Sequence, residues 1–102
     1  MGISIRLETE NREELQLILD PTNLLHRVLP EPGDPEFRWA NTIDWYGDTV
    51  FNPLQAGLLR EEWAILIQSA TDQKTKELLE AIDEVLLKCG STNHVYVRFL
   101  GD

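Results

Sequence analysis

The stretch TDQKTKELLEAIDEVLLKCGSTNHVYVRFL, residues 71–100, contains two kinds of hydrophobic periodicity in succession. In its first part, apolar residues recur three and four positions apart, which is the spacing of one face of an α-helix. That face consists of Leu78, Leu79, Ile82, Val85, Leu86 and Cys89. After Gly90, apolar and polar residues alternate from Val95 to Phe99, which is typical of a half-buried strand. The stretch therefore predicts a helix that Thr71-Asp72 caps and that runs to about Cys89, followed by a β-strand.

A second long helix is expected just before this one. Asn52-Pro53 is a favourable N-cap followed by proline at the first helical position, and the helix is predicted to run to about Ala70. Its apolar residues form one stripe of Leu59, Trp63, Leu66, Ile67 and Ala70, and a second stripe of Leu54, Leu58 and Ile65. Because a helix that is apolar on two sides needs two neighbours, we expect it to lie between the sheet and another helix. The alternative is that the second stripe forms a homodimer interface.

The N-terminal part predicts two strands and a short helix. Alternation predicts a strand over residues 3–7 and a second over residues 15–19, where Leu15, Leu17 and Leu19 share one parity. A helix over residues 12–19 is the competing interpretation, because Glu and Leu favour helices. Asp20-Pro21 resembles a cap and first turn, so a short helix is expected from there to Leu29, before Pro30.

The middle of the chain predicts a stiff loop and a third strand. Residues 31–35 contain two prolines and a glycine, which favours a loop within one domain. Phe37, Trp39 and Ile43 share one parity and predict a strand over residues 37–43. The resulting order, β-β-α-β-α-α-β, predicts one small α+β domain over residues 1–102. Its antiparallel or mixed sheet of about four strands packs against two long C-terminal helices and one short helix.

Charge and composition limit the classes of function. The 102 residues include 18 acidic and 9 basic ones, with a formal net charge of −9. This charge disfavours nucleic acid and favours a basic partner. The single cysteine excludes an intramolecular disulfide and leads us to expect a cytoplasmic protein. No apolar run is long enough to span a bilayer and no secretory signal is recognised, so no membrane association is expected.

The segment DWYGDT, residues 44–49, combines turn-forming residues with groups that bind ligands. Gly47, Asp48 and Thr49 favour a turn, and Asp44 is placed to accept hydrogen bonds from the turn amides. Asp44 and Asp48 are also candidate ligands of a hard cation, although the spacing is not that of an EF-hand. We favour the structural interpretation, with Arg98 of the last strand pairing with Asp44 or Asp48.

Other catalytic candidates are weak. His26 and His94 are single histidines, and Cys89 lies on an apolar helix face where a thiol is inert. No zinc spacing, phosphate-binding loop or nucleophile elbow occurs, so we expect no catalytic residue, metal or cofactor.

The residues YGDTVFN before the helix and RFLGD at the C-terminus resemble a group of small bacterial proteins of uncharacterised function. The resemblance covers about a quarter of the chain and implies no activity. It implies that the turn and the C-terminal strand form one structural unit.

Three hypotheses of function remain. The leading one is a non-enzymatic protein-binding module of the inhibitor or immunity type, which binds a basic partner. Its proposed contacts are Trp45, Tyr46 and an acidic ridge formed by Glu77, Glu80 and Glu84. The second is a small-ligand or metal-dependent enzyme centred on the turn at Asp44 and Asp48. The third is a homodimeric accessory subunit that uses Leu54, Leu58 and Ile65.

Overall fold

The computed structural model describes residues 2–101 as a layer of strands packed on a layer of helices. Its elements in chain order are β1 (Ser4–Thr9), β2 (Glu14–Ile18), α1 (Leu25–Val28), the 3₁₀ helix η1 (Ala40–Thr42), β3 (Asp48–Phe51), α2 (Pro53–Ser69), α3 (Gln73–Gly90) and β4 (Val95–Leu100). The predicted α+β class and the order β-β-α-β-α-α-β are confirmed.

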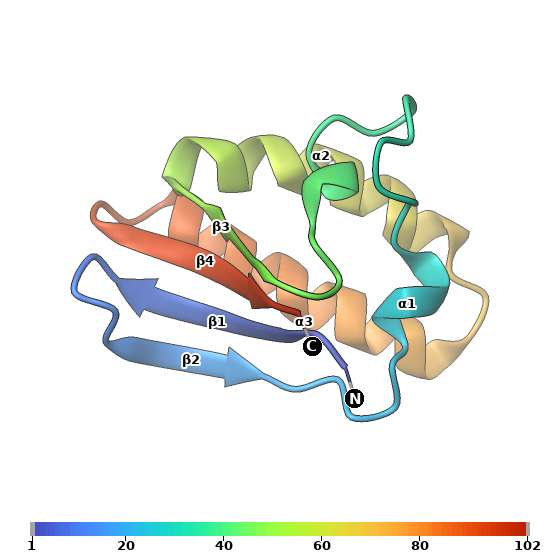
Figure 1. Cartoon of the computed structure of the whole chain (residues 1–102), viewed down its shortest axis with the longest axis horizontal. Helices are drawn as coiled ribbons and strands as arrows, with labels where there is room; N and C mark the ends of the chain where they lie inside the picture. Colours follow the sequence, from blue (N-terminus) through green and yellow to red (C-terminus); the bar gives the residue numbers. More distant parts are fainter. Residues whose placement is uncertain (1, 102) are drawn as a thin grey trace.

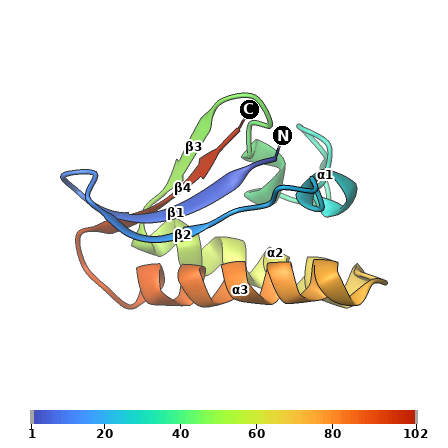
Figure 2. The same cartoon turned by 90° about the horizontal axis from the view of Figure 1, so that it is seen from below.

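The sheet is antiparallel, with strand order β2-β1-β4-β3. The first and last strands therefore lie side by side in its centre, and β2 and β3 form its edges (Figure 1). Helices α2 and α3 pack against each other and cover one face of the sheet, whereas neither of them covers the other face (Figure 2). We call this second face the open face.

The core lies between the sheet and the two long helices. Ile5, Val97 and Phe99 point from the sheet into it, and Leu59 and Leu79 point from the helices. The Trp63 ring is fully buried, and its Nε1–H donates a 2.8 Å hydrogen bond to the Leu79 carbonyl across the helix pair. This bond satisfies the polar atom that tryptophan brings into the core.

Both long helices begin where their caps predict. The Asn52 side chain accepts a hydrogen bond from the Gln55 amide, and the Gln55 side chain accepts one from the Asn52 amide, which completes a capping box. Asp72 accepts a hydrogen bond from the Thr75 amide. Bonds from Thr75 hold the pKa of the Asp72 carboxyl below its ordinary value.

The predicted third strand over residues 37–43 is wrong. This segment is a loop that ends in η1, and the third strand is β3, immediately after the Gly47 turn. The cause is Glu62 on α2, whose carboxylate accepts hydrogen bonds from the amides of Arg38, Trp39 and Ala40 at 2.8–3.2 Å. These amides are therefore used by a helix side chain and cannot take part in a strand ladder.

Residues 14–18 are a strand, not the competing helix, and the parity that their leucines share faces away from the core. The pairing of β1 with β2 shifts register between Leu7 and Glu8. As a result, Ile18 packs on the core, whereas Leu15, Leu17 and Leu19 are exposed. A one-residue shift of register moves a whole row of side chains to the other face of the sheet. This explains why the leucines point outward and Ile18 points to the core.

The short helix starts later than predicted. It spans only Leu25–Val28, and Asp20 lies before it in an irregular segment. The buried Asp20 carboxylate nevertheless accepts hydrogen bonds from the amides of Leu24 and Leu25, both at 2.9 Å. Asp20 therefore stabilises the start of α1 from a distance instead of forming its N-cap.

Candidate functional site

The open face of the sheet exposes large apolar side chains. Alternation along the paired strands places on this face Ser4, Arg6, Glu8, Leu17, Leu19, Asp48, Val50, Tyr96, Arg98 and Leu100. Leu17, Leu19 and Val50 are 42%, 62% and 41% exposed. Leu17 and Val50 lie on the two edge strands, with Arg6 and Arg98 between them in the cross-strand register. Large apolar groups exposed on an uncovered sheet face are typical of an interaction surface.

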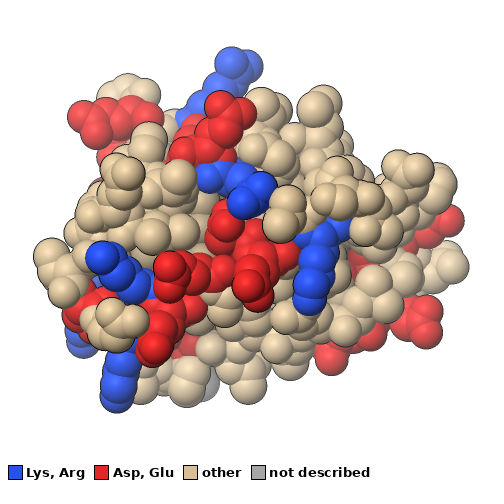
Figure 3. All heavy atoms as spheres, turned by 180° about the vertical axis from the view of Figure 1, so that it is seen from behind, with Lys and Arg blue, Asp and Glu red and all other residues tan. Residues whose placement is uncertain are grey.

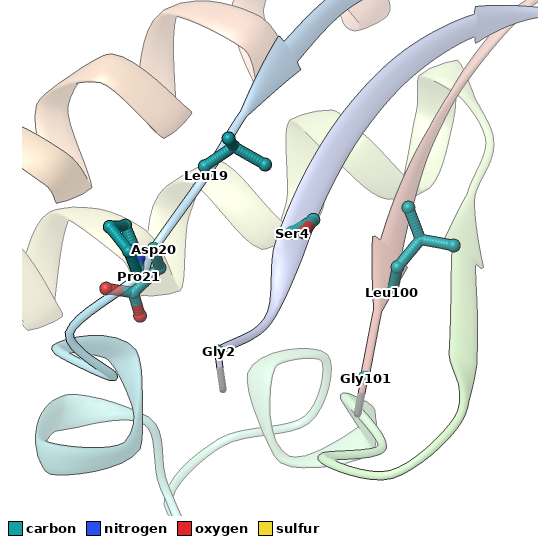
Figure 4. A pocket seen from close by; sticks show the side chains of 7 residues that line it. All are labelled: Gly2, Ser4, Leu19, Asp20, Pro21, Leu100 and Gly101. Carbon is teal, nitrogen blue, oxygen red and sulfur yellow. The ribbon is translucent and has the colours of Figure 1, made fainter.

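A first depression lies on the open face at the end near the chain termini. It has a volume of about 480 Å³ and is lined by Gly2, Ser4, Leu19, Asp20, Pro21, Leu100 and Gly101. Figure 4 shows the Leu19 and Leu100 side chains on either side of β1, with the small residues Ser4 and Gly2 between them. We call it the Leu19 hollow. Its apolar walls and low floor suit an apolar side chain.

A second depression lies toward the other end of the same face. It has a volume of about 430 Å³ and is lined by Glu8, Thr9, Glu10, Arg12, Val50, Tyr96 and Arg98. We call it the Glu8 hollow. Its lining is mostly polar and contains Glu8, a residue that is only 1% exposed.

Glu8 belongs to a charged network that crosses three strands. Its Oε1 accepts a bond from Arg98 Nε, and Arg98 Nη1 lies 3.1 Å from Asp48 Oδ2. The bond to Glu8 is the main reason that the pKa of Arg98 is raised above its ordinary value. The predicted pairing of Arg98 with the turn is therefore found at Asp48, by a single contact and not a bidentate one.

The turn at Asp44 and the C-terminal strand form one structural unit. Asp44 Oδ1 accepts a hydrogen bond from the Tyr46 amide at 2.9 Å, and the Gly101 amide donates to the Gly47 carbonyl at 2.7 Å. A Cβ on Gly101 would lie 2.6 Å from the backbone of Asp44, Trp45 and Gly47. Thr49 Oγ1 accepts from the Asp44 amide at 2.8 Å. The close approach of the C-terminal strand to the turn explains why residue 101 is a glycine. The hydrogen bonds of Asp44 and Thr49 explain the short polar residues of the turn.

The two aromatic residues of the turn have different environments. Tyr46 is 78% exposed, whereas Trp45 packs on the core and lies 4.9 Å from the His26 ring between centroids. Trp45 is therefore mainly a packing residue, and of the two predicted aromatic contacts only Tyr46 is freely accessible.

The acidic ridge lies on the opposite layer from the open face. Glu77, Glu80 and Glu84 are exposed on α3, and none of them forms an ion pair with another described residue. Figure 3 shows acidic side chains gathered across the middle of this helical side, with a few basic ones among them. Nearby, Asp83 is paired with Arg60 at 2.8 Å, a bond that raises the pKa of Arg60.

The second stripe of α2 is not covered by the sheet or by α3. Leu54 is 74% exposed and Ile65 is also exposed, whereas Leu58 is half-buried. The helix does pack against both the sheet and α3, as expected, but two of the three residues of its second stripe stay exposed. Exposed Glu61 lies on the same helical face between Leu58 and Ile65, so a dimer through this stripe would have to accommodate its charge.

The side chains that were candidates for catalysis are engaged in structural contacts or are buried. Asp44 bonds a turn amide and Asp48 pairs with Arg98, and residues 2–101 contain no group of three or more His, Cys, Asp and Glu placed to hold a metal. Cys89 is buried, and burial raises the pKa of its thiol to about 11. A thiol with this pKa is almost entirely protonated near neutral pH and is a poor nucleophile.

Comparison of the chain with family models, with curated proteins and with solved structures gave no match. The resemblance of the turn and C-terminus to a group of bacterial proteins therefore stays a prediction. Among the described residues, none of the helices combines the length and the apolar character that crossing a membrane requires.

Sequence reasoning missed the open face because its two main features depend on distant partners. Leu17 and Leu19 look like core residues until the register shift in β1 and β2 turns them outward. Glu8 looks like an ordinary exposed strand residue, and it is buried beside Arg98, 90 positions later in the chain.

Proposed function

We propose that the protein is a non-enzymatic protein-binding module of the inhibitor or immunity type, and that a basic protein docks on its open face. The observation that carries the proposal is an uncovered sheet face with exposed Leu17, Leu19 and Val50. The basic character of the partner follows from the net charge of −9, which attracts cations and disfavours nucleic acid.

The acidic ridge of Glu77, Glu80 and Glu84 has a different part in this proposal. It lies on the helical layer, so it contributes to the long-range field and increases the rate of association with a basic partner. The contacts that set the rate of dissociation are those of the open face. A single buried cysteine supports a reducing compartment, and we propose the cytoplasm.

The experiment compares two matched leucine pairs. The full chain is immobilised, exposed to a lysate of the source organism, and washed at low and then high salt, and each eluate is identified by mass spectrometry. Leu17→Asn with Leu19→Asn changes the open face. Leu54→Asn with Leu87→Asn changes exposed leucines of the helices and serves as the control.

The proposal predicts one basic protein that binds the wild type and the control, leaves at high salt, and is lost with the open-face pair. Purified partner should then bind with the same dependence on the two pairs. Identical capture by both pairs, or capture of acidic proteins, would contradict it. The homodimer on α2 predicts instead that the Leu54 and Leu87 pair alters the molar mass measured by light scattering.

A further inference from the structure

We propose that the Glu8 hollow binds an arginine side chain of the basic partner, an inference that rests on the proposed function. The starting point is the buried Glu8 carboxylate. Its Oε1 is bonded by Arg98, but within residues 2–101 its Oε2 has no hydrogen-bond partner. An unpaired oxygen on a buried carboxylate is costly, and a donor that reaches it gains the full value of a charge-assisted bond.

Neither of the two arginines that approach the Glu8 carboxylate bonds this oxygen. Among residues 2–101, Arg6 Nε is also buried without a hydrogen-bond partner, but its ion pair is with Glu14 and not with Glu8. Arg98 already uses its Nε on Glu8 and its Nη1 on Asp48. Arg12 has its Nε 3.9 Å from Glu8 Oε2, which is too long for a hydrogen bond, and its side chain is 67% exposed. Arg12 therefore covers the hollow loosely, and an incoming guanidinium replaces it at little cost.

The position of Arg12 also indicates which cation fits. A guanidinium already approaches Glu8 Oε2 in the free protein, and its planar fork matches a carboxylate better than an ammonium does. Val50 and Tyr96 line the same hollow and offer apolar surface for the methylene groups of an arginine. A volume of about 430 Å³ is sufficient for one such side chain.

The two hollows define the spacing of the contact. Ser4 lines the Leu19 hollow and Glu8 lines the Glu8 hollow, and both point to the open face from β1. Four residues along a strand span about 13 Å. An extended partner segment with an apolar residue and an arginine four positions apart therefore fills both hollows.

The test uses the full chain and a defined probe, N-acetyl-arginine amide, followed by NMR signals of the Arg98 Nε–H and the amides of residues 9–12. N-acetyl-citrulline amide is the neutral control of the same shape, and N-acetyl-lysine amide compares the two cations. The proposal predicts saturable shifts with the arginine amide, weaker ones with lysine and none with citrulline. Shifts that stay linear, or that are equal with citrulline, would overturn it.

Two variants locate the binding. Arg12→Asn removes the loosely held competitor and suits the backbone, because Arg12 has φ 66° and asparagine tolerates this left-handed region. It should tighten binding of the arginine amide by about two- to fivefold, as expected for loss of one exposed ion pair. Glu8→Gln should abolish saturation. Unchanged or weaker binding in Arg12→Asn would contradict the exchange even if Glu8→Gln does not fold.

The outcome is distinguishable from that of the proposed function. A triple variant, Glu77→Gln, Glu80→Gln and Glu84→Gln, should keep saturable binding of the arginine amide, and its loss would assign the probe to the ridge and overturn the proposal. Capture that depends on Leu17 and Leu19 without saturation by the arginine amide would refute the hollow alone. Saturation without such capture would refute the proposed docking alone.

Discussion

Glu62 determines the conformation of residues 38–40, and its removal has a calculable cost. In Glu62→Ala, the amides of Arg38, Trp39 and Ala40 lose the carboxylate that accepts from them at 2.8–3.2 Å. A hydrogen bond to a charged group contributes about 1.5–3 kcal/mol, but the exposed Arg38 amide turns to water at little cost. Two part-buried amides therefore predict a loss of about 3–6 kcal/mol in the free energy of unfolding.

Urea denaturation followed by circular dichroism and tryptophan fluorescence measures this loss. The matched control is Glu61→Ala, which changes the preceding, exposed residue of the same helix and should cost less than about 0.5 kcal/mol. Glu62→Gln keeps one acceptor oxygen and should lie between the two. Amide hydrogen exchange at Ala40 should accelerate in Glu62→Ala. Equal stabilities of the Glu61 and Glu62 variants, with unchanged exchange at Ala40, would refute the explanation of the missing strand.

Three further predictions concern glycines and the buried thiol. Gly101→Ala places a Cβ 2.6 Å from three backbone atoms and should cost about 2–4 kcal/mol in urea denaturation, whereas a cost below about 0.5 kcal/mol would show that the turn yields. Gly57→Ala adds a Cβ to open space within α2 and should stabilise by about 0.5–1 kcal/mol, so destabilisation would contradict this packing. The pKa of Cys89 is raised from 9.0 to about 11, so the unfolded state loses this proton first and stability falls from pH 9 to pH 11. Cys89→Ala should remove up to about 1.4 kcal/mol per pH unit of that slope, and equal slopes in the two proteins would contradict the shift.

The features that the sequence predicted well are those set by neighbouring residues. The N-caps at Asn52 and Asp72 fix the starts of the long helices within the first turn, and alternation identifies the strands at both ends of the chain. The apolar stripe of α3 requires only helical spacing, and all of its residues but half-buried Leu78 are buried. These elements account for the correct order of the fold.

The features that it predicted wrongly depend on contacts between distant residues. Phe37, Trp39 and Ile43 have strand parity, but Glu62 on another element holds the backbone of residues 38–40 in a loop. Leu17 and Leu19 have core parity, but a register shift turns them outward. Local patterns do not contain this information, because both effects arise only when the elements pack.

The same distinction applies to the candidate site. The turn residues Asp44 and Asp48, and the link of Asp48 to Arg98, follow from turn chemistry and from the position of the last strand. The Glu8 hollow does not, because Glu8 has the same outward parity as Arg6 and nothing local marks it as buried. Two charged residues at opposite ends of the chain meet there only because β1 and β4 are neighbours.

The central claim is that the open face, and not the helical layer, contacts the partner. Methyl NMR spectra of the leucines and valines, recorded with and without the purified basic partner, test it directly. The account predicts that the signals of Leu17, Leu19, Val50 and Leu100 change while those of Leu54 and Leu87 do not. Changes at Leu54 or Leu87 with an unaltered open face would contradict it and would assign the contact to the helices.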